Sequence, residues 1–296
     1  MKVMAVTQEN TPYYPEQGSF VAENYVQSLL PADLAPADAR VLFVHAHPDD
    51  ESTSTGATMG ALSRAGAQVD LLTATRGEMG EVIPDDLKYL EAWDSGTTDR
   101  GEGLGELREK ELKAALDVLG VRHHEYLGRG DARAENGATI YRDSGMEWGE
   151  DGRAKANPVA ADDCLTKLSE EEEAEAIASY IRARKPHVVV TYDDGGGYGH
   201  PDHVRVHLAT SRALNILRGS DAEPQLAWGL EGDSNPDDTR LQAVIEGDKD
   251  AKREAMRAHA TQVIIVSDDV FKFSNLVPQK ISAVETYRLL SSKGSA

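Results

Sequence analysis

Histidines and carboxylates gather in two short segments of this 296-residue chain. Residues 45–51 are His-Ala-His-Pro-Asp-Asp-Glu, and residues 199–203 are Gly-His-Pro-Asp-His. His47 and Asp50 are three residues apart, so one helical turn would place an imidazole and a carboxylate on the same side. Such a pair forms half of a Zn²⁺ site, and the second segment can supply a further imidazole. The spacing therefore predicts a metal site shared by the two segments.

The other polar residues of these segments have more than one interpretation. Asp49 must point away from its neighbour Asp50, and we expect it beside the water that a metal would activate. Of His200 and His203, one would bind the metal and the other would face the substrate. An aspartate at a strand-to-helix junction is also common as a helix N-cap. Because the same His-Pro-Asp core occurs twice, each time after a predicted strand, the catalytic interpretation is favoured.

The elements that position these segments alternate between strands and helices. Each segment follows a short apolar run that is typical of a buried strand. The predicted strands are residues 41–45, 69–75, 124–127, 187–192, 226–230 and 263–266, and the predicted helices are 57–65, 106–119, 169–184, 201–217 and 248–260. This alternation predicts an α/β fold, with a Rossmann-like, mostly parallel sheet and helices on both faces. Ligands bind outside the carboxyl ends of such strands, so the two segments should meet there.

Two long polar stretches, residues 128–168 and 231–247, are expected to be loops. Long loops in a compact domain are commonly functional, so we expect these loops to border the active site. The alternative is that they are acidic surface segments without a function in the site. Residues 1–38 are expected to form an N-terminal extension that ends in a Pro/Ala/Asp linker, and residues 39–296 are expected to form one domain.

Composition excludes several classes of partner. The chain has 31 Lys and Arg against 51 Asp and Glu, a net charge of −20. Such a surface repels nucleic acid and anionic membranes, so we expect neither as a partner. No apolar run approaches the roughly 20 residues that span a bilayer. The single cysteine, Cys164, excludes an internal disulfide and a cysteine-based zinc site, and it fits a cytoplasmic location.

The motifs together resemble the LmbE/PIG-L family of metal-dependent N-deacetylases. AHPDDE follows one strand, and GHPDH follows another about 150 residues later. The resemblance covers most of residues 40–288 and is closest to the mycothiol-pathway branch. That branch shares five strings with this chain, at residues 45–52, 80–83, 141–146, 187–204 and 255–263.

This resemblance implies a role for each matching residue. His47, Asp50 and His203 would bind one Zn²⁺ per chain, although Fe²⁺ also accepts two histidines and an aspartate. Asp49 would be the general base. His200 would stabilise the oxyanion, Asp202 would tune it and Tyr198 would polarise the carbonyl. The residues implied in binding the hydroxyls or the rest of the substrate are Glu81, Asp143 and Met146.

The resemblance also implies a substrate class, namely a small amino sugar joined to inositol, from which acetate is removed. An amidase that cleaves mycothiol S-conjugates is the alternative within the same fold. The hydroxyl-rich residues 52–55, which carry no cation, resemble the deacetylase branch. A non-catalytic sugar-binding relative would have no need of a base beside a metal. A dinucleotide-binding protein is disfavoured because Gly195–Gly199 lack the G-x-G-x-x-G spacing.

Three further features of the sequence concern an arginine, the residues near the end of a helix, and a run of glutamates. The relatives carry an arginine near the start of the predicted helix 106–119, where this chain has Gly103. Arg100 or Arg108 would replace it at the substrate, and an ordinary ion pair of Arg108 with a neighbouring glutamate is the alternative. His259 and Gln262 belong to a shared string, but they also fit the end of a helix. Glu170–Glu175 are expected to form a solvated helix face.

Overall fold

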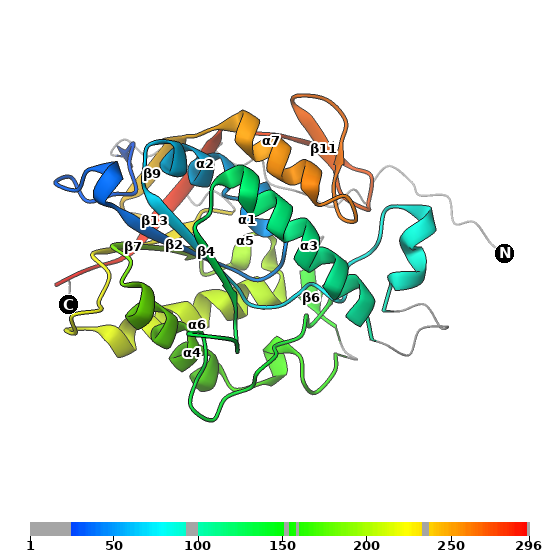
Figure 1. The fold of residues 1–296 in the computed structure, drawn as a ribbon, viewed down its shortest axis with the longest axis horizontal. Coiled ribbons are helices and arrows are strands. Elements are labelled where there is room, and N and C mark those ends of the chain that lie inside the picture. Colours follow the sequence, from blue (N-terminus) through cyan, green and yellow to red (C-terminus); the bar gives the residue numbers. More distant parts are fainter. Residues whose placement is uncertain (1–24, 93–99, 151–153, 158–159, 233–236, 295–296) are drawn as a thin grey trace.

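A central eight-stranded sheet organises the chain in the computed structural model, which describes residues 25–92, 100–150, 154–157, 160–232 and 237–294 (Figure 1). The strand order is β1-β9-β13-β8-β7-β2-β3-β4. In this order the strands are Tyr25–Val26, Gln242–Glu246, Val284–Ser292, Leu226–Leu230, Val188–Tyr192, Arg40–His45, Gln68–Thr73 and His123–Tyr126. All neighbours pair in parallel except β13, which is antiparallel to both β8 and β9. The mostly parallel sheet is therefore confirmed.

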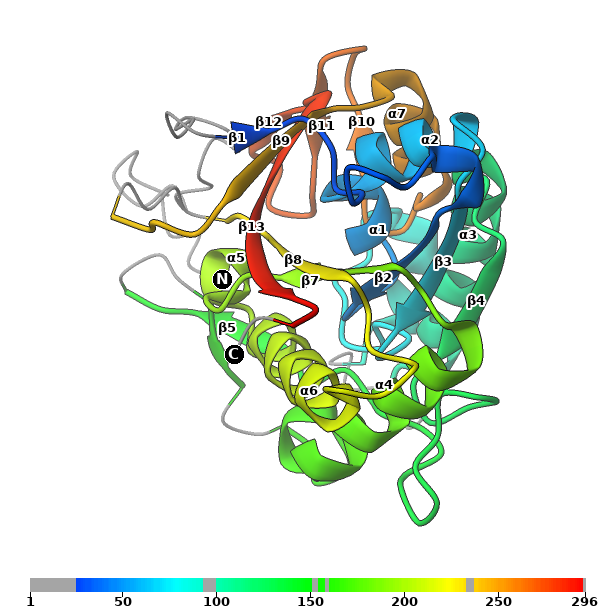
Figure 2. The same cartoon turned by 90° about the vertical axis from the view of Figure 1, so that its left-hand side faces the viewer.

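Helices cover both faces of the sheet (Figure 2). They are α1 (Asp50–Thr53), α2 (Gly56–Arg64), α3 (Glu102–Leu119), α4 (Glu170–Arg184), α5 (Gly196–Gly199), α6 (Pro201–Leu217) and α7 (Lys249–Ala258). Alternate residues of β2 divide between two cores: Leu42 and Val44 pack with α4 and α6, whereas Val41 and Phe43 pack with α2, α3 and α7. This alternation follows from the two-residue period of a strand.

Three strands of the main sheet were not expected, namely β1, which lies inside the expected N-terminal extension, β9 and β13. β9 lies inside residues 231–247, which were expected to form a loop, and β13 was not predicted at all. The buried positions of β13 include charged residues, so its sequence shows no apolar run. Its Glu285 pairs with Lys252 at 2.8 Å, and its Arg288 pairs with Glu231 at 3.0 Å. Charge pairing has replaced the apolar pattern on which strand prediction depends.

The expected strand 263–266 is also different in the structure. Only Ile264–Ile265 form a strand, β10, which pairs with β11 (Val270–Lys272) rather than with the main sheet. β12 (Pro278–Lys280) completes this small sheet. Within the expected loop 128–168, β5 (Met146–Trp148) and β6 (Ala154–Ala156) form a two-stranded sheet.

The end of the expected extension takes part in the fold. Tyr25 and Val26 pair with β9, and Leu29 and Leu30 are buried in the core. The indole of Trp228 in β8 donates to the carbonyl oxygen of Leu29 at 3.0 Å. Residues 1–24 lie outside the described residues. Among the helices that the structure describes, none is long and apolar enough to cross a membrane.

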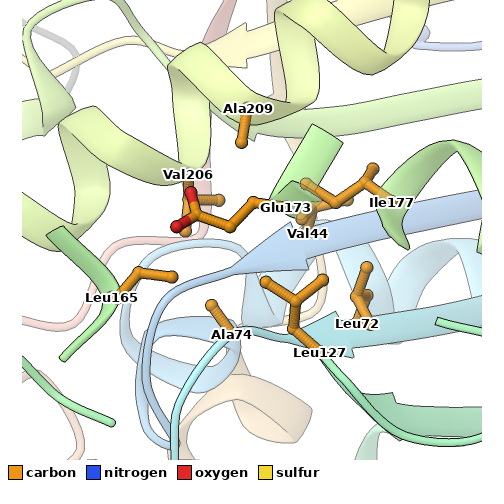
Figure 3. A pocket seen from close by; sticks show the side chains of 9 residues that line it. All are labelled: Val44, Leu72, Ala74, Leu127, Leu165, Glu173, Ile177, Val206 and Ala209. Carbon is orange, nitrogen blue, oxygen red and sulfur yellow. The ribbon is translucent and has the colours of Figure 1, made fainter. Parts of the chain in front are cut away.

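Glu173 corrects the expectation that residues 170–175 form a solvated face. Its side chain lies among apolar residues between α4, α6 and the sheet (Figure 3). It is fully buried and accepts from Arg205 of α6 at 2.7 Å. Burial raises the pKa of Glu173 to about 7, although the charge of Arg205 opposes this rise. The pair joins α4 to the helix that carries His203.

This raised pKa makes a prediction about stability. Between the pKa of an unfolded glutamate and about 7, the native protein holds the proton of Glu173 more tightly than the unfolded chain. The free energy of unfolding should therefore fall as pH rises through this range, by up to about 1.4 kcal/mol per pH unit. Glu173→Gln should remove this contribution, measured by urea unfolding from pH 5 to pH 7. Glu175→Gln, exposed on the same helix, is the control, and an equal change there would contradict the assignment.

Candidate active site

The two predicted segments meet at the carboxyl ends of β2 and β7. β2 pairs with β7 on one side and with β3 on the other. The chain leaves β2 toward β3 and leaves β7 toward β8, so these neighbours form the point at which the direction of strand order reverses. Open α/β sheets bind ligands at such a point. His47 follows β2, and both His200 and His203 follow β7.

His47, Asp50 and His203 lie close together and are buried. The carboxylate of Asp50 is 3.4 Å from His47 Nδ1 and 3.4 Å from His203 Nε2. His203 Nδ1 is 3.3 Å from the carbonyl oxygen of Gly196, an acceptor, so Nδ1 carries the proton and Nε2 keeps its lone pair. Nε2 is buried and has no hydrogen-bond partner. An unpartnered imidazole nitrogen facing a carboxylate is the donor set that a divalent metal prefers.

Tyr192, the last residue of β7, supports both of these ligand candidates. Its hydroxyl donates to Asp50 Oδ2 at 2.7 Å and accepts from the Ala46 amide at 2.8 Å. Its ring stacks on the ring of His203, with the centroids 4.2 Å apart. Burial would raise the pKa of Asp50, but the neighbouring His203 and His47 lower it well below its usual range.

Asp202 contacts His47 through its side chain and His200 through its backbone. Its Oδ2 accepts from the Ser144 amide at 2.9 Å and lies 3.1 Å from His47 Nε2. A carboxylate at Nε2 fixes the orientation of an imidazole whose Nδ1 faces the ligand site. The backbone amide of Asp202 donates to His200 Nδ1 at 3.2 Å.

His200 is the N-cap of α6. Because its Nδ1 accepts the Asp202 amide, its other nitrogen carries the proton when the ring is neutral. Burial, together with the neighbouring His47 and His203, holds the pKa of His200 well below its usual range. A neutral ring with a proton on Nε2 can donate to an oxyanion. The ring lies 4.7 Å from that of His47 and 4.8 Å from that of His203, measured between centroids.

The side chain of Asp49 bonds Arg108 and makes no capping hydrogen bond to α1, although Asp49 is the N-cap residue of that helix. Arg108 Nη2 donates to Asp49 Oδ2 at 2.9 Å and also to the Pro48 carbonyl, and Nη1 donates to the Gly77 carbonyl at 2.7 Å. The expected alternative, an ion pair of Arg108 with a helix neighbour, is therefore wrong, since the side chain crosses to the β2 loop instead. Burial raises the pKa of Asp49 to about 6 against the lowering effect of Arg108.

The expected substrate-binding residues lie at different depths. Asp143 is buried; its Oδ1 is 3.7 Å from His47 Nε2 and accepts from the Gly145 amide at 2.8 Å. Met146 is half-buried at the start of β5, and Glu81 is exposed after β3. The ring of Tyr198 lies 5.3 Å from that of His203. Arg100 pairs with Asp163.

Several hydroxyls of residues 52–55 turn into the protein. Ser52 donates to Glu51, Thr53 to the Asp49 carbonyl at 2.9 Å and Thr55 to the Glu51 carbonyl at 3.2 Å. These residues therefore shape the loop that carries Asp49. In this structure these hydroxyls contribute to the conformation of the loop, because they form hydrogen bonds within the protein.

Sequence reasoning missed Glu51 and Tyr192 and left His259 undecided. The side chain of Glu51 is fully buried and accepts from His259 Nε2 at 2.7 Å. Both residues lie in the strings that carry the family resemblance, and this was the only signal for them in the sequence. The hydrogen bond between Glu51 and His259 joins residues that are 208 positions apart in the sequence.

Among the residues that the structure describes, three groups of neighbouring side chains could hold a metal. Two sets have all their ligand atoms within 4.8 Å of one another: His47 with His200 and His203, and His47 with Asp143 and Asp202. The third is the expected set around Asp50, in which each histidine lies 3.4 Å from the carboxylate. His47 Nε2 already contacts Asp202, which disfavours the set with Asp143 and Asp202, whereas the free lone pair of His203 is available to both of the other sets.

Comparison with known proteins identifies the family to which the chain is similar. The family model described as PIG-L: GlcNAc-PI de-N-acetylase matches residues 42–214. A 1D-myo-inositol 2-acetamido-2-deoxy-alpha-D-glucopyranoside deacetylase of Kineococcus radiotolerans is 40% identical, with 91% of this chain and 84% of the relative covered. A protein of the same name from Thermomonospora curvata is 36% identical, with 87% and 92% covered.

Solved structures show the same fold at lower identity. The zinc-inhibited form of a teicoplanin deacetylase superposes with a TM-score of 0.55 at 20% identity, covering 87% of this chain and all of that chain. This likeness concerns the fold alone. The match of the family model over more than half of the chain, together with the relatives at 36–40% identity, shows that this chain belongs to the PIG-L/LmbE family of de-N-acetylases.

Proposed function

We propose that this chain hydrolyses the acetamide of 1D-myo-inositol 2-acetamido-2-deoxy-α-D-glucopyranoside to glucosaminyl-inositol and acetate, a step of mycothiol biosynthesis. The supporting observation is a carboxylate on a rigid turn, Asp49, beside a buried two-histidine, one-aspartate cluster. It occurs in a chain 40% identical over most of its length to a deacetylase named for this substrate. The proposed partner is therefore a small polyol, and the proposed location is the cytoplasm.

The cluster of His47, Asp50 and His203 would hold one Zn²⁺ per chain, and Fe²⁺ fits the same donors. When bound, such a metal lowers the pKa of a water molecule to about 7 and polarises a carbonyl. Two imidazoles and one carboxylate leave the metal a net positive charge. Asp202 would keep His47 oriented through Nε2, and Tyr192 would keep Asp50 oriented through its hydroxyl.

The residues around the cluster supply the proton transfers. Asp49 accepts a proton from the water that attacks the acetyl carbon and returns it to the departing amine as the C–N bond breaks. Arg108 keeps the Asp49 carboxylate in place. His200 donates from Nε2 to the oxyanion, with Tyr198 assisting at the carbonyl. Asp143, Glu81 and Met146 face the sugar and inositol, and Arg108 borders this side of the site.

A mycothiol S-conjugate amidase is the alternative activity with the same cluster. The inward hydroxyls of residues 52–55 support the deacetylase because they hold a compact, uncharged loop next to Asp49. A sugar-binding protein without activity has no use for the arginine-held Asp49.

The metal ligands are tested by His203→Ala. Losing one of three protein ligands should remove most of the bound metal and the activity, and chelation of the unaltered protein should also abolish turnover. Metal analysis of purified proteins measures this directly. His207→Gln is the matched control, since His207 lies one turn further along α6 and contacts the Tyr192 carbonyl. Undiminished metal in His203→Ala would remove His203 from the set.

The base is tested by Asp49→Asn, which keeps the shape of the side chain but accepts no proton. We expect full metal content and a fall in kcat of roughly 10²- to 10⁴-fold. Asp50→Asn should instead lose metal. Loss of metal from Asp49→Asn would make Asp49 a ligand and contradict its role as base.

Substrate choice is tested with three compounds and one enzyme batch in an amine-release assay. We expect kcat/KM for the inositol-linked N-acetylglucosamine to exceed that for plain N-acetylglucosamine, because a site that bonds the additional hydroxyls rejects an analogue lacking them. It should also exceed that for a mycothiol S-conjugate, because the compact loop of residues 52–55 suits an acetyl group better than a bulky acyl group. Asp143→Ala should shrink the first preference, and Glu147→Ala, exposed on β5, should not. Faster turnover of the S-conjugate would indicate the amidase.

A further inference from the structure

The backbone of Asp49 has an unusual conformation. Its φ is 101° and its ψ is −29°, in the left-handed region that residues with a Cβ seldom adopt. A residue keeps such a conformation only when its surroundings hold it there, and such residues cluster at functional sites. The contacts that hold Asp49 are therefore informative about how its carboxylate is aimed.

Glu51 holds the backbone of Asp49 from one side. Its Oε2 accepts from the Asp49 amide at 2.9 Å, and its Oε1 accepts from Ser52 and from His259 Nε2, the latter at 2.7 Å. Glu51 and His259 are both fully buried. A buried carboxylate needs such donors, and without them it would not keep one orientation.

Arg108 holds Asp49 from the other side, through the Pro48 carbonyl and the Asp49 carboxylate. The two supports are joined to each other. Thr261, in the turn after His259, donates to Glu111 of α3 through its amide at 2.8 Å and its hydroxyl at 2.6 Å. Glu111 lies one turn after Arg108, so the end of α7 and the middle of α3 hold the Asp49 loop as one unit.

We infer that Glu51 and His259 are positioning residues, which act through Asp49 by fixing the backbone conformation that aims its carboxylate as the base. Glu51 bonds the strained peptide, and His259 fixes Glu51 from a distant part of the chain. The inference rests on the proposed function, because it assigns the effect of both residues to the base.

The test compares Glu51→Ala in two backgrounds, the unaltered protein and Asp49→Asn, in the metal-loaded enzyme. With Asp49 present, loss of the acceptor should lower kcat about ten- to hundredfold, since a small misplacement of a catalytic group has effects of this order. KM and metal content should change little. With Asp49→Asn, where no base remains to be aimed, the further fall should be less than about twofold, because residues acting as a unit are not additive.

A conservative pair of variants keeps the test independent of folding. Glu51→Gln retains an oxygen for the Asp49 amide and should recover most of the kcat lost in Glu51→Ala. His259→Phe removes the donor to Glu51 at similar volume and should show the same dependence on the background if Glu51→Ala does not fold. His124→Gln is the matched control, because His124 bonds Thr73 on β3. It should leave kcat within about twofold.

The outcomes separate this inference from the proposed function. An equal fall in kcat in both backgrounds, or a loss of metal from Glu51→Ala or His259→Phe, would overturn the positioning role while leaving Asp49 as the base. If Asp49→Asn itself kept full kcat, the base assignment would fail, and the inference would fall with it.

Discussion

The parallel pairing of β2 with β7 is the constraint on which the candidate site depends. Val41 lies opposite Val188 and Phe43 opposite Val190, so both strands end at the same edge. Adjacent strands are roughly 4.8 Å apart, and the segments that leave them must therefore meet. Because β2 continues to β3 and β7 continues to β8, the chain departs in opposite directions and leaves room for a ligand between the two segments.

Pairing at this edge brings together more carboxylates than a buried region normally accepts. Each is stabilised by donors that come from another element. Tyr192 donates to Asp50, the Ser144 amide donates to Asp202 and Arg108 donates to Asp49. Burying a charge is costly unless it is paired, so these contacts are needed for folding as well as for chemistry. They also preorganise the site, because none of them has to form during the reaction.

The pairing of buried charges also explains where prediction from the sequence succeeded and where it failed. β2 and β7 are continuous apolar runs between two layers of helices, and they lie within about one residue of the expected 41–45 and 187–192. β13 escaped prediction because its buried Glu285 and Arg288 are paired with residues far away in the chain. Glu173 was expected in solvent for the same reason, since its partner Arg205 lies on another helix.

The sequence by itself determined the residue types of the site, their spacing after two strands and the edge of the sheet where they would meet. These properties are local, because strand and turn periodicity relate residues a few positions apart. Only the tertiary structure decided that Arg108 contacts Asp49, that Asp202 contacts His47 and that His259 fixes Glu51. Such contacts join residues 59 to 208 positions apart, and they depend on how helices pack on the sheet, which no local pattern encodes.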